Sequence, residues 1–217
     1  MIEIVALTGI GEVTPACDLA AVLAHAMNAL GLVPRPGDVL VVTQKIVSKS
    51  EGRMVALDAV IPDAEDEALA AQVRKDPRLV ALVRRESAAV VRAVPNVLIT
   101  RHRTGHVMAN AGIDQSNLGP DRLGHALLLP EDGDASARRL YAALAERFDP
   151  VPAVVISDSF GRPWRYGVVN VAIGAAGLPA LIDRRGEPDR DGRRLEVTQV
   201  ALADMIASAA GLATGEG

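Results

Sequence analysis

The chain has little of three kinds of residue that often decide the class of a protein. Of its 217 residues only Cys17 is a cysteine, which excludes an intrachain disulfide and a multi-cysteine zinc site. Aromatic residues make up 2% of the chain, so a core must be built from Ala, Val, Leu and Ile. Lysine is scarce as well, because only Lys45, Lys49 and Lys75 occur among the 23 basic residues.

Long hydrophobic runs and an excess of positive charge are also missing. No apolar run approaches the roughly 20 residues that a membrane-spanning helix needs. The first residues, MIEIVALTGIGE, lack the basic start of a signal peptide. A formal net charge of -4 argues against a broad nucleic-acid-binding surface. We therefore expect a cytoplasmic protein that binds neither membranes nor nucleic acids.

The residues that are present predict a folded chain of mixed secondary structure. Hydrophobic residues make up 49% of the sequence, and the length suits one domain over residues 1–217. Three apolar runs predict buried strands, at residues 2–7, 39–44 and 152–158. Two segments predict helices, at residues 19–30 and at 65–93, the second interrupted near Asp76. This alternation indicates an α/β or α+β fold.

No Walker A loop and no dinucleotide-binding glycine fingerprint occurs. Four polar segments nevertheless interrupt the apolar ones and could carry chemistry, at residues 8–12, 43–53, 110–117 and 157–166. The first contains two glycines that allow backbone N–H groups to approach a ligand, or forms an ordinary turn. The second places Lys45 and Lys49 after a buried strand, where phosphates often bind, or forms a solvated charged loop.

The other two polar segments are rich in oxygen ligands. Residues 110–117 could bind Mg²⁺ or Mn²⁺, or form a loop in which Asn and Asp bond their own backbone. Asp158 and Ser159 end a buried strand and could hold a metal against a phosphate. Arg162 and Arg165 follow and could pair with phosphate or carboxylate. Three of the five aromatic residues fall within residues 160–166, which indicates a planar ligand, an interface or a small hydrophobic plug.

The histidines and the cysteine give weaker indications of a functional site than the four polar segments do. His102 and His106 flank a turn, RHRTGH, and could form a metal pair, but we interpret them as basic residues at the surface. Cys17 has no basic neighbour in the sequence and is interpreted as structural.

Six motifs follow one another along the chain: LTGIGEV, VVTQKIVSKSEGR, NAGIDQSN, SDSFGRPWR, AIGAAGL and LEVTQVALADMIASAAGL. In this order they resemble the coenzyme F-420-0:L-glutamate ligase family, the γ-glutamyl ligases of a deazaflavin coenzyme. The resemblance covers nearly the whole chain. It implies an unusual α+β fold of mixed sheets with packed helices, assembled as an intimate homodimer.

The resemblance also implies an activity. Members of the family use GTP and Mg²⁺ or Mn²⁺ to add L-glutamate to F-420-0, or to its dehydro form, through a γ-glutamyl amide. An acyl phosphate is the implied intermediate, GDP is released, and K⁺ assists some members. Two alternatives remain open from the residues alone: a metal-dependent phosphohydrolase that uses the same acids, and a non-catalytic dimer that binds nucleotide or coenzyme.

Particular residues match the functional positions of the family. The resemblance implies catalytic roles for Asp114 and Asp158, and a metal held by Asp114, Asp158, Ser159 and Glu216. The implied GTP contacts are Ile10, Gly11, Glu12, Val13, Gln44, Lys45, Lys49 and Asn117.

The chain departs from the family at its end. It stops at ATGEG, where members usually continue through a glycine-rich loop and a strand, so we expect it to lack both. In some bacterial members a flavin-binding domain follows, and a full-length protein could carry or associate with one.

Overall fold

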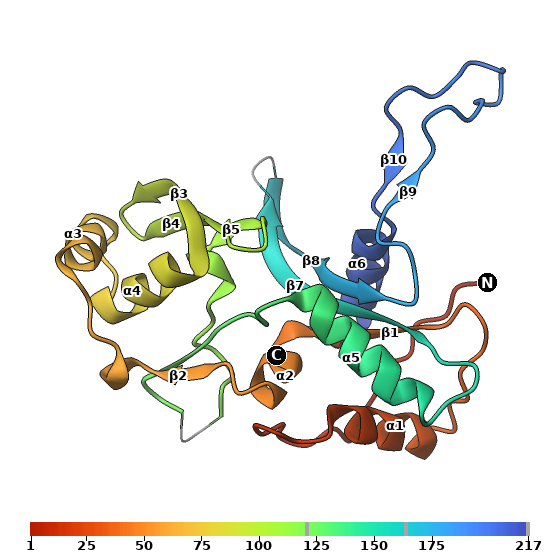
Figure 1. Ribbon diagram of the computed structural model, residues 1–217, viewed down its shortest axis with the longest axis horizontal. Coiled ribbons are helices and arrows are strands. Elements are labelled where there is room, and N and C mark those ends of the chain that lie inside the picture. The colour runs from red at the N-terminus through yellow and green to blue at the C-terminus, as the bar shows by residue number, and fades with distance from the viewer. Residues whose placement is uncertain (120–121, 163–164, 216–217) are drawn as a thin grey trace.

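The computed structural model describes residues 1–119, 122–162 and 165–215. In these ranges, ten strands form four small sheets, of which the central one is mixed and the other three are antiparallel, and six α-helices pack around them (Figure 1). The α+β alternative from the sequence is therefore confirmed.

A three-stranded sheet lies at the centre of the molecule. Its strands are β1 (Val39–Thr43), β7 (Ala153–Arg162) and β8 (Arg165–Ala176), in the order β1-β7-β8. Strand β1 runs parallel to β7, whereas β7 and β8 are antiparallel. The strands predicted at residues 39–44 and 152–158 are thus confirmed, and they are neighbours in this sheet.

Helices cover both faces of the central sheet. Successive side chains of a strand point to opposite faces. Val154 and Ile156 accordingly pack in one core with α1 (Leu19–Ala29) and α5 (Gly133–Ala145). Val155 packs instead against α6 (Leu202–Thr214). The predicted helix at 19–30 is confirmed, and its first turn is capped by the Asp18 carboxylate, which accepts a hydrogen bond from Ala21 N.

A second hydrophobic core lies beside the central sheet, at the left in Figure 1. Two helices contribute to it, α3 (Ala64–Val73) and α4 (Pro77–Glu86). They pack with an antiparallel sheet made of β3 (Ser87–Val94), β4 (Val97–His102) and β5 (Val107–Ala109). Two short 3-10 turns, Leu57–Ala59 and Asn110–Gly112, adjoin these elements.

The prediction of a helical segment through residue 93 is wrong over its last part. The helix ends at Glu86, and β3 begins at Ser87. Asn96 has a φ of 66° and turns the chain tightly, so that β3 pairs back with β4. The run of β-branched residues in β3 suits this pairing better than it suits a helix.

The predicted strand at residues 2–7 is also wrong. Residues 1–14 form no helix or strand in the structure, and Ile2, Ile4 and Val5 are exposed. Within this stretch, Val13 is buried in the core that contains α1 and α5, and Leu7 and Ile10 pack against that core. Residues 2–7 have the apolar composition that is typical of a strand, but they join none of the sheets described here.

Two further sheets complete the described architecture. Strand β2 (Met54–Ala56) follows the short helix α2 (Gln44–Ser50) in the chain. It pairs with β6 (His125–Leu127) in an antiparallel sheet of two strands. Strands β9 (Ile182–Asp183) and β10 (Gln199–Val200) pair with each other and form a hairpin arm that projects from the body (Figure 1).

Gly133 and Gly174 allow α5 to approach β8 closely. A Cβ atom at Gly174 would lie 2.1 Å from the carbonyl oxygen of Gly133. We expect Gly174→Ala to lower the free energy of unfolding by about 1–3 kcal/mol, because backbone must move to relieve the overlap. Gly11→Ala is the matched control, since nothing lies within 4 Å of a Cβ built there. Urea denaturation of both variants measures the difference, and equal stabilities would contradict the prediction.

Candidate functional site

Two of the four polar segments meet where β1 ends. Thr43, the last residue of β1, pairs with Ser157 of β7. Because the two strands are parallel, Gln44 and Lys45 leave one strand beside the place where Asp158 continues the other. This strand-end edge is where ligands commonly bind in sheets of parallel strands.

The third polar segment reaches the same place through an ion pair between Asp114 and Lys45. Lys45 Nζ lies 2.7 Å from Asp114 Oδ2 and donates to the carbonyl of Ser116 at 3.1 Å. The other carboxylate oxygen of Asp114 accepts hydrogen bonds from the N–H and the hydroxyl of Ser116, both at 2.7 Å. Both oxygens of Asp114 are therefore oriented.

The surroundings of Asp114 favour its ionised form. Burial alone would raise the pKa of this carboxyl group, because burial penalises the charged state. The hydrogen bond from Lys45 and those from Ser116 outweigh burial and hold the pKa below its ordinary value. Asp114 thus offers anionic oxygens, which are the kind of atom that Mg²⁺ and Mn²⁺ prefer as ligands.

A second ion pair joins the first polar segment to α2. Lys49 Nζ lies 2.6 Å from Glu12 Oε1 and 3.4 Å from the carbonyl oxygen of Asn117, to which it donates. The Lys49 side chain is 7% exposed, whereas that of Glu12 is 63% exposed. Lys49 is therefore a buried cation that holds the loops of residues 8–12 and 110–117 together.

A groove of 440 Å³ opens beside Lys49 and Glu12. Its walls come from the loop that precedes α1, from α2 and β2, and from residues 118–125, and they include Val13, Pro15, Met54, Leu118, Arg122 and His125. The groove combines apolar surface with a few charged groups, as small-molecule sites commonly do. A larger pocket of 570 Å³ lies between α1 and the segment after α5, but none of the predicted site residues lines it.

The remaining GTP-contact residues differ in their surroundings. Gln44 is 4% exposed, and its side-chain oxygen accepts a hydrogen bond from the Ser48 hydroxyl at 3.0 Å. Ile10 packs against the core, and Gly11 and Asn117 are exposed.

Asp158 and Ser159 lie on β7, opposite Val171 and Asn170 of β8. The backbone N–H of Ser159 donates to Asp158 Oδ1 at 2.9 Å. Among the residues that the structure describes, no three His, Cys, Asp or Glu side chains are placed to hold one metal ion. Glu216, the fourth predicted metal ligand, lies outside those residues. The metal site therefore stays a prediction.

The aromatic cluster is only partly described. The Phe160 ring meets the His106 ring edge-on, with 6.5 Å between the centroids. Tyr166 is fully exposed. Trp164 and the side chains of Arg162 and Arg165 lie outside what the structure describes.

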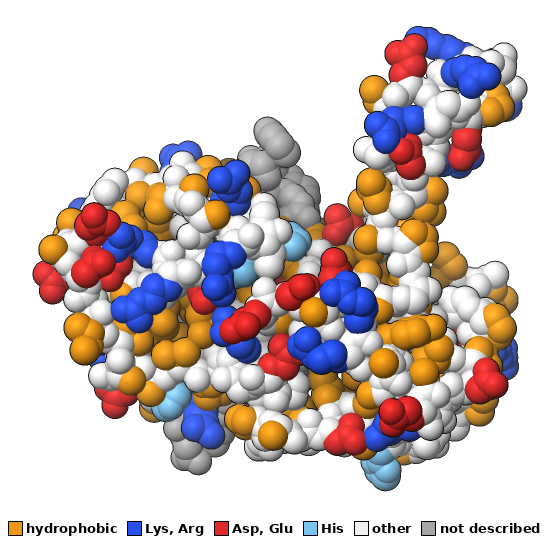
Figure 2. Space-filling view, viewed as in Figure 1, with side chains coloured by type: hydrophobic (Ala, Val, Ile, Leu, Met, Phe, Trp, Pro, Cys, Tyr) orange, Lys and Arg blue, Asp and Glu red, His pale blue; other side chains and the backbone are white. Residues whose placement is uncertain are grey.

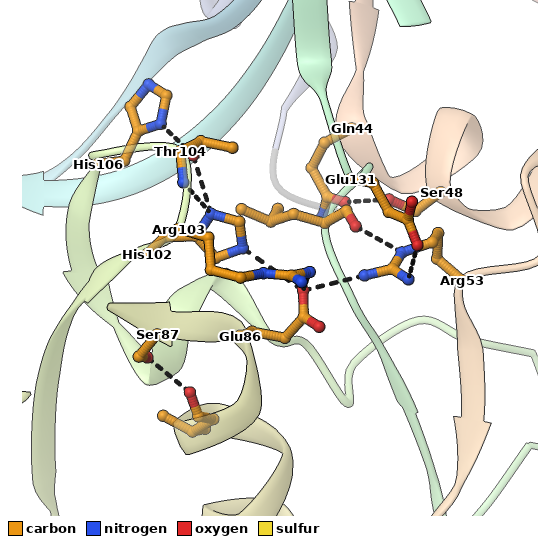
Figure 3. Close-up of polar contacts among 12 residues, drawn as sticks. Gln44, Ser48, Arg53, Glu86, Ser87, His102, Arg103, Thr104, His106 and Glu131 are labelled. Atoms are coloured by element: carbon orange, nitrogen blue, oxygen red, sulfur yellow. Dashed lines mark hydrogen bonds and ion pairs between the residues drawn. The ribbon is translucent and has the colours of Figure 1, made fainter. Parts of the chain in front are cut away.

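An ionic cluster around Glu86 was not predicted from the sequence (Figure 3). Glu86 Oε2 accepts hydrogen bonds from Arg53 at 2.9 Å and from Arg103 at 2.8 Å. Arg53 also donates to the carbonyl oxygen of Leu129 and to Glu131. Since Arg53 follows α2 and Glu86 ends α4, this cluster fixes the helix that carries Lys45 and Lys49 against the second core.

His102 belongs to this cluster, so the interpretation of it as a surface residue is wrong. It is 1% exposed, its Nδ1 lies 2.8 Å from the Thr104 hydroxyl, and its Nε2 lies 3.6 Å from Glu86 Oε2. Thr104 in turn bonds His106, whose pKa is lowered by burial and by the nearby His102. Nothing in the local sequence of Glu86 or His102 indicates that they meet, because they end two different elements.

No helix in the described part of the chain has the length and apolar character of a membrane span.

Comparison with known proteins gives one consistent result. The model of the family described as F420-0:Gamma-glutamyl ligase matches residues 9–217. A protein of Methanopyrus kandleri named Coenzyme F420:L-glutamate ligase is 45% identical over 94% of this chain and 78% of its own length. Proteins of the same name from Methanothermobacter thermautotrophicus and Natronomonas pharaonis are 40% and 44% identical, each over 99% of this chain and over 84% and 81% of their own lengths.

Proposed function

The chain belongs to the F420-0:gamma-glutamyl ligase family, and on this premise we propose that it is a GTP- and divalent-metal-dependent ligase. It adds L-glutamate to F-420-0, or to the dehydro form, through a γ-glutamyl amide and acts as a homodimer. The observation that carries the proposal is the meeting of Asp114 with Lys45, and of Glu12 with Lys49, beside a groove at the end of β1.

The proposed reaction has two steps. A carboxylate oxygen of the acceptor attacks the γ-phosphorus of GTP, and the bond to the β-phosphate oxygen breaks to release GDP. The amine of glutamate then attacks the carbonyl carbon of the acyl phosphate, and inorganic phosphate leaves as the nitrogen loses a proton. Both steps gather negative charge, so the main task of the protein is to position and neutralise phosphate groups.

Residues of this chain fit that task. Lys49 is buried at the groove and would bind a phosphate as a fixed point charge. Asp114, Asp158 and Ser159, together with Glu216, would hold Mg²⁺ or Mn²⁺, which supplies positive charge to the phosphates. Lys45 now neutralises Asp114, and a metal bound by that carboxylate would release Lys45 to contact the nucleotide.

One experiment separates this proposal from its alternatives. The chain is incubated with F-420-0, GTP, Mg²⁺ or Mn²⁺ and glutamate, and the products are analysed by mass spectrometry. A mass increase of one or more glutamyl units supports the ligase. Release of phosphate without F-420-0 or glutamate would indicate a phosphohydrolase, and GTP binding without turnover would indicate a binding module. K⁺ dependence and an associated flavin-binding domain stay predictions from the family resemblance, and a cytoplasmic location stays a prediction from the composition and the N-terminal sequence.

The role of Lys49 can be tested separately. We expect Lys49→Ala to raise the Michaelis constant for GTP roughly tenfold or more, because a charge-assisted contact to phosphate is lost. Lys75→Ala is the control, since Lys75 lies in the link between α3 and α4 and does not line the groove. Steady-state kinetics at saturating acceptor and glutamate measures both variants. Similar Michaelis constants for the two would remove Lys49 from the nucleotide site.

A further inference from the structure

A hydrogen-bonded chain of two histidines and a threonine extends from Glu86 to strand β7. His102 is buried beside Glu86, and Thr104 lies between His102 and His106 (Figure 3). At the far end of the chain, the ring of His106 meets the ring of Phe160 on β7 edge-on. The chain therefore brings a titratable group to the strand that carries two of the predicted metal ligands.

His106 lies close to these two predicted ligands along β7. The pairing of β7 with β1 ends one residue before Asp158. Strand β5, which begins directly after His106, packs against β7, and His106 itself contacts Phe160. Asp158 and Phe160 share a face of the strand, because successive side chains alternate between the faces. Asp158 and Ser159 thus lie between the end of β1 and the residue that His106 contacts.

The hydrogen bonds of the chain fix which nitrogen of His106 carries a proton. The backbone N–H of Thr104 donates to Nδ1 of His102 at 3.1 Å, so this nitrogen carries no proton of its own. The Thr104 hydroxyl lies 2.8 Å from the same nitrogen and donates its single proton to it. The hydroxyl oxygen therefore accepts from the Nδ1–H of His106, at 2.9 Å. In the neutral ring of His106 the lone pair is then on Nε2, which is the nitrogen that can accept a proton.

The surroundings of His106 suit a group that is neutral at rest and gains a proton during a reaction. The ring is half-buried, and burial together with the nearby His102 lowers its pKa below the ordinary value. Three groups act in the opposite direction and favour the imidazolium: Asp204 in the first turn of α6, Asp134 in the first turn of α5, and the backbone of Ala172 on β8. Figure 2 shows histidine and acidic side chains at the surface where β5 meets the central sheet, so a substrate can reach this place. A neutral imidazole there is a general base at neutral pH.

We propose that His106 accepts the proton that the amine of glutamate loses, which makes it a further catalytic residue of the ligation. This inference rests on the proposed function. As the nitrogen attacks the acyl phosphate, a carbon–nitrogen bond forms, and phosphate leaves with the electron pair of the carbon–oxygen bond that breaks. The proton of the nitrogen passes to Nε2 of His106, and the imidazolium later returns it to water. Thr104 and His102 are positioning residues, because they hold the ring and its tautomer without contact to the substrate.

The test separates the two steps of the reaction. Hydroxylamine captures an acyl phosphate as a hydroxamate, and it is reactive at neutral pH without a base, so it reports the first step in the absence of glutamate. We expect His106→Gln to form the hydroxamate within about twofold of the wild-type rate, but to add glutamate about a hundredfold more slowly or worse at neutral pH. Gln keeps an N–H group that can donate to Thr104. His25→Gln is the matched control and should leave both rates unchanged, because His25 is exposed on α1.

The pH dependence of glutamate addition gives a readout that a merely structural role would not change. The wild-type rate should fall as the pH falls through the pKa of His106, which lies below the ordinary value for histidine. The deficit of His106→Gln should become smaller at high pH, where the amine of glutamate loses its proton to the solvent, and added imidazole should restore part of the rate.

Two results would overturn the proposal. An equal loss of hydroxamate formation and of glutamate addition in His106→Gln would show a structural role, and glutamate addition at the wild-type rate would remove His106 from the reaction. A wild-type chain that forms neither the hydroxamate nor the glutamyl product would show instead that the proposed function is wrong, and this inference would fall with it.

Discussion

Asp114→Asn should lower the rate of glutamate ligation by roughly a thousandfold, which corresponds to about 4 kcal/mol of transition-state stabilisation. The substitution keeps the shape of the side chain and an oxygen that can accept from Ser116. It removes the negative charge that Lys45 now contacts at 2.7 Å. An amide cannot replace an ionised carboxylate as a metal ligand without loss, so the charge of the phosphates would be poorly neutralised. Asp158→Asn should have a comparable effect if it shares the metal.

The measurement is single-turnover ligation at saturating Mn²⁺, GTP, F-420-0 and glutamate. Asp58→Asn is the control, because Asp58 is exposed in the 3-10 turn after β2 and has no proposed ligand. Circular dichroism and the melting temperature verify that each variant is folded. Wild-type turnover by Asp114→Asn at saturating metal would remove this residue from the site.

Glu86→Gln should lower the free energy of unfolding by about 2–4 kcal/mol. Glu86 is 8% exposed and bonds two arginines, of which Arg53 is largely buried. Removal of one partner from a buried ion pair costs more than the pair contributes, because the remaining charge is left without compensation. Arg103 is half exposed and can turn to water, which limits the loss. Glu131→Gln, whose side chain is 76% exposed, should change stability by less than about 1 kcal/mol.

The pH dependence of this effect has a definite sign. Burial would raise the pKa of Glu86, but the nearby His102 and the charges of Arg53 and Arg103 lower it below its ordinary value. The stabilisation from the ionised group is therefore present above the pKa of an unfolded glutamate and is lost as the pH falls through the lower folded value. Urea denaturation at neutral and acidic pH should show the difference between wild type and Glu86→Gln becoming smaller as the pH falls. A difference that grows toward acid would contradict this account.

The family assignment and much of the local structure could be predicted from the sequence alone. Continuous apolar runs identified β1 and β7 because a strand buried on both faces needs no polar alternation. Asp18 and Gly31 delimit α1 by local capping and chain reversal, which operate within a few residues. The polar motifs that follow the strands indicated the candidate site, because the type and the order of these residues can be read directly from the sequence.

Contacts between distant segments were decided only by the tertiary structure. Local pattern cannot specify that Lys45 pairs with Asp114 or that Glu86 meets His102, because such contacts depend on how strands and helices pack. It also misassigned residues 2–7 and 87–93, where strand or helix formation depends on a neighbour rather than on propensity. Residues 87–94 find that neighbour in β4, which satisfies their backbone hydrogen bonds. A strand is stabilised only when another strand lies beside it and satisfies its backbone hydrogen bonds. Residues 2–7 have no such neighbour within the described chain, and they therefore form no strand there.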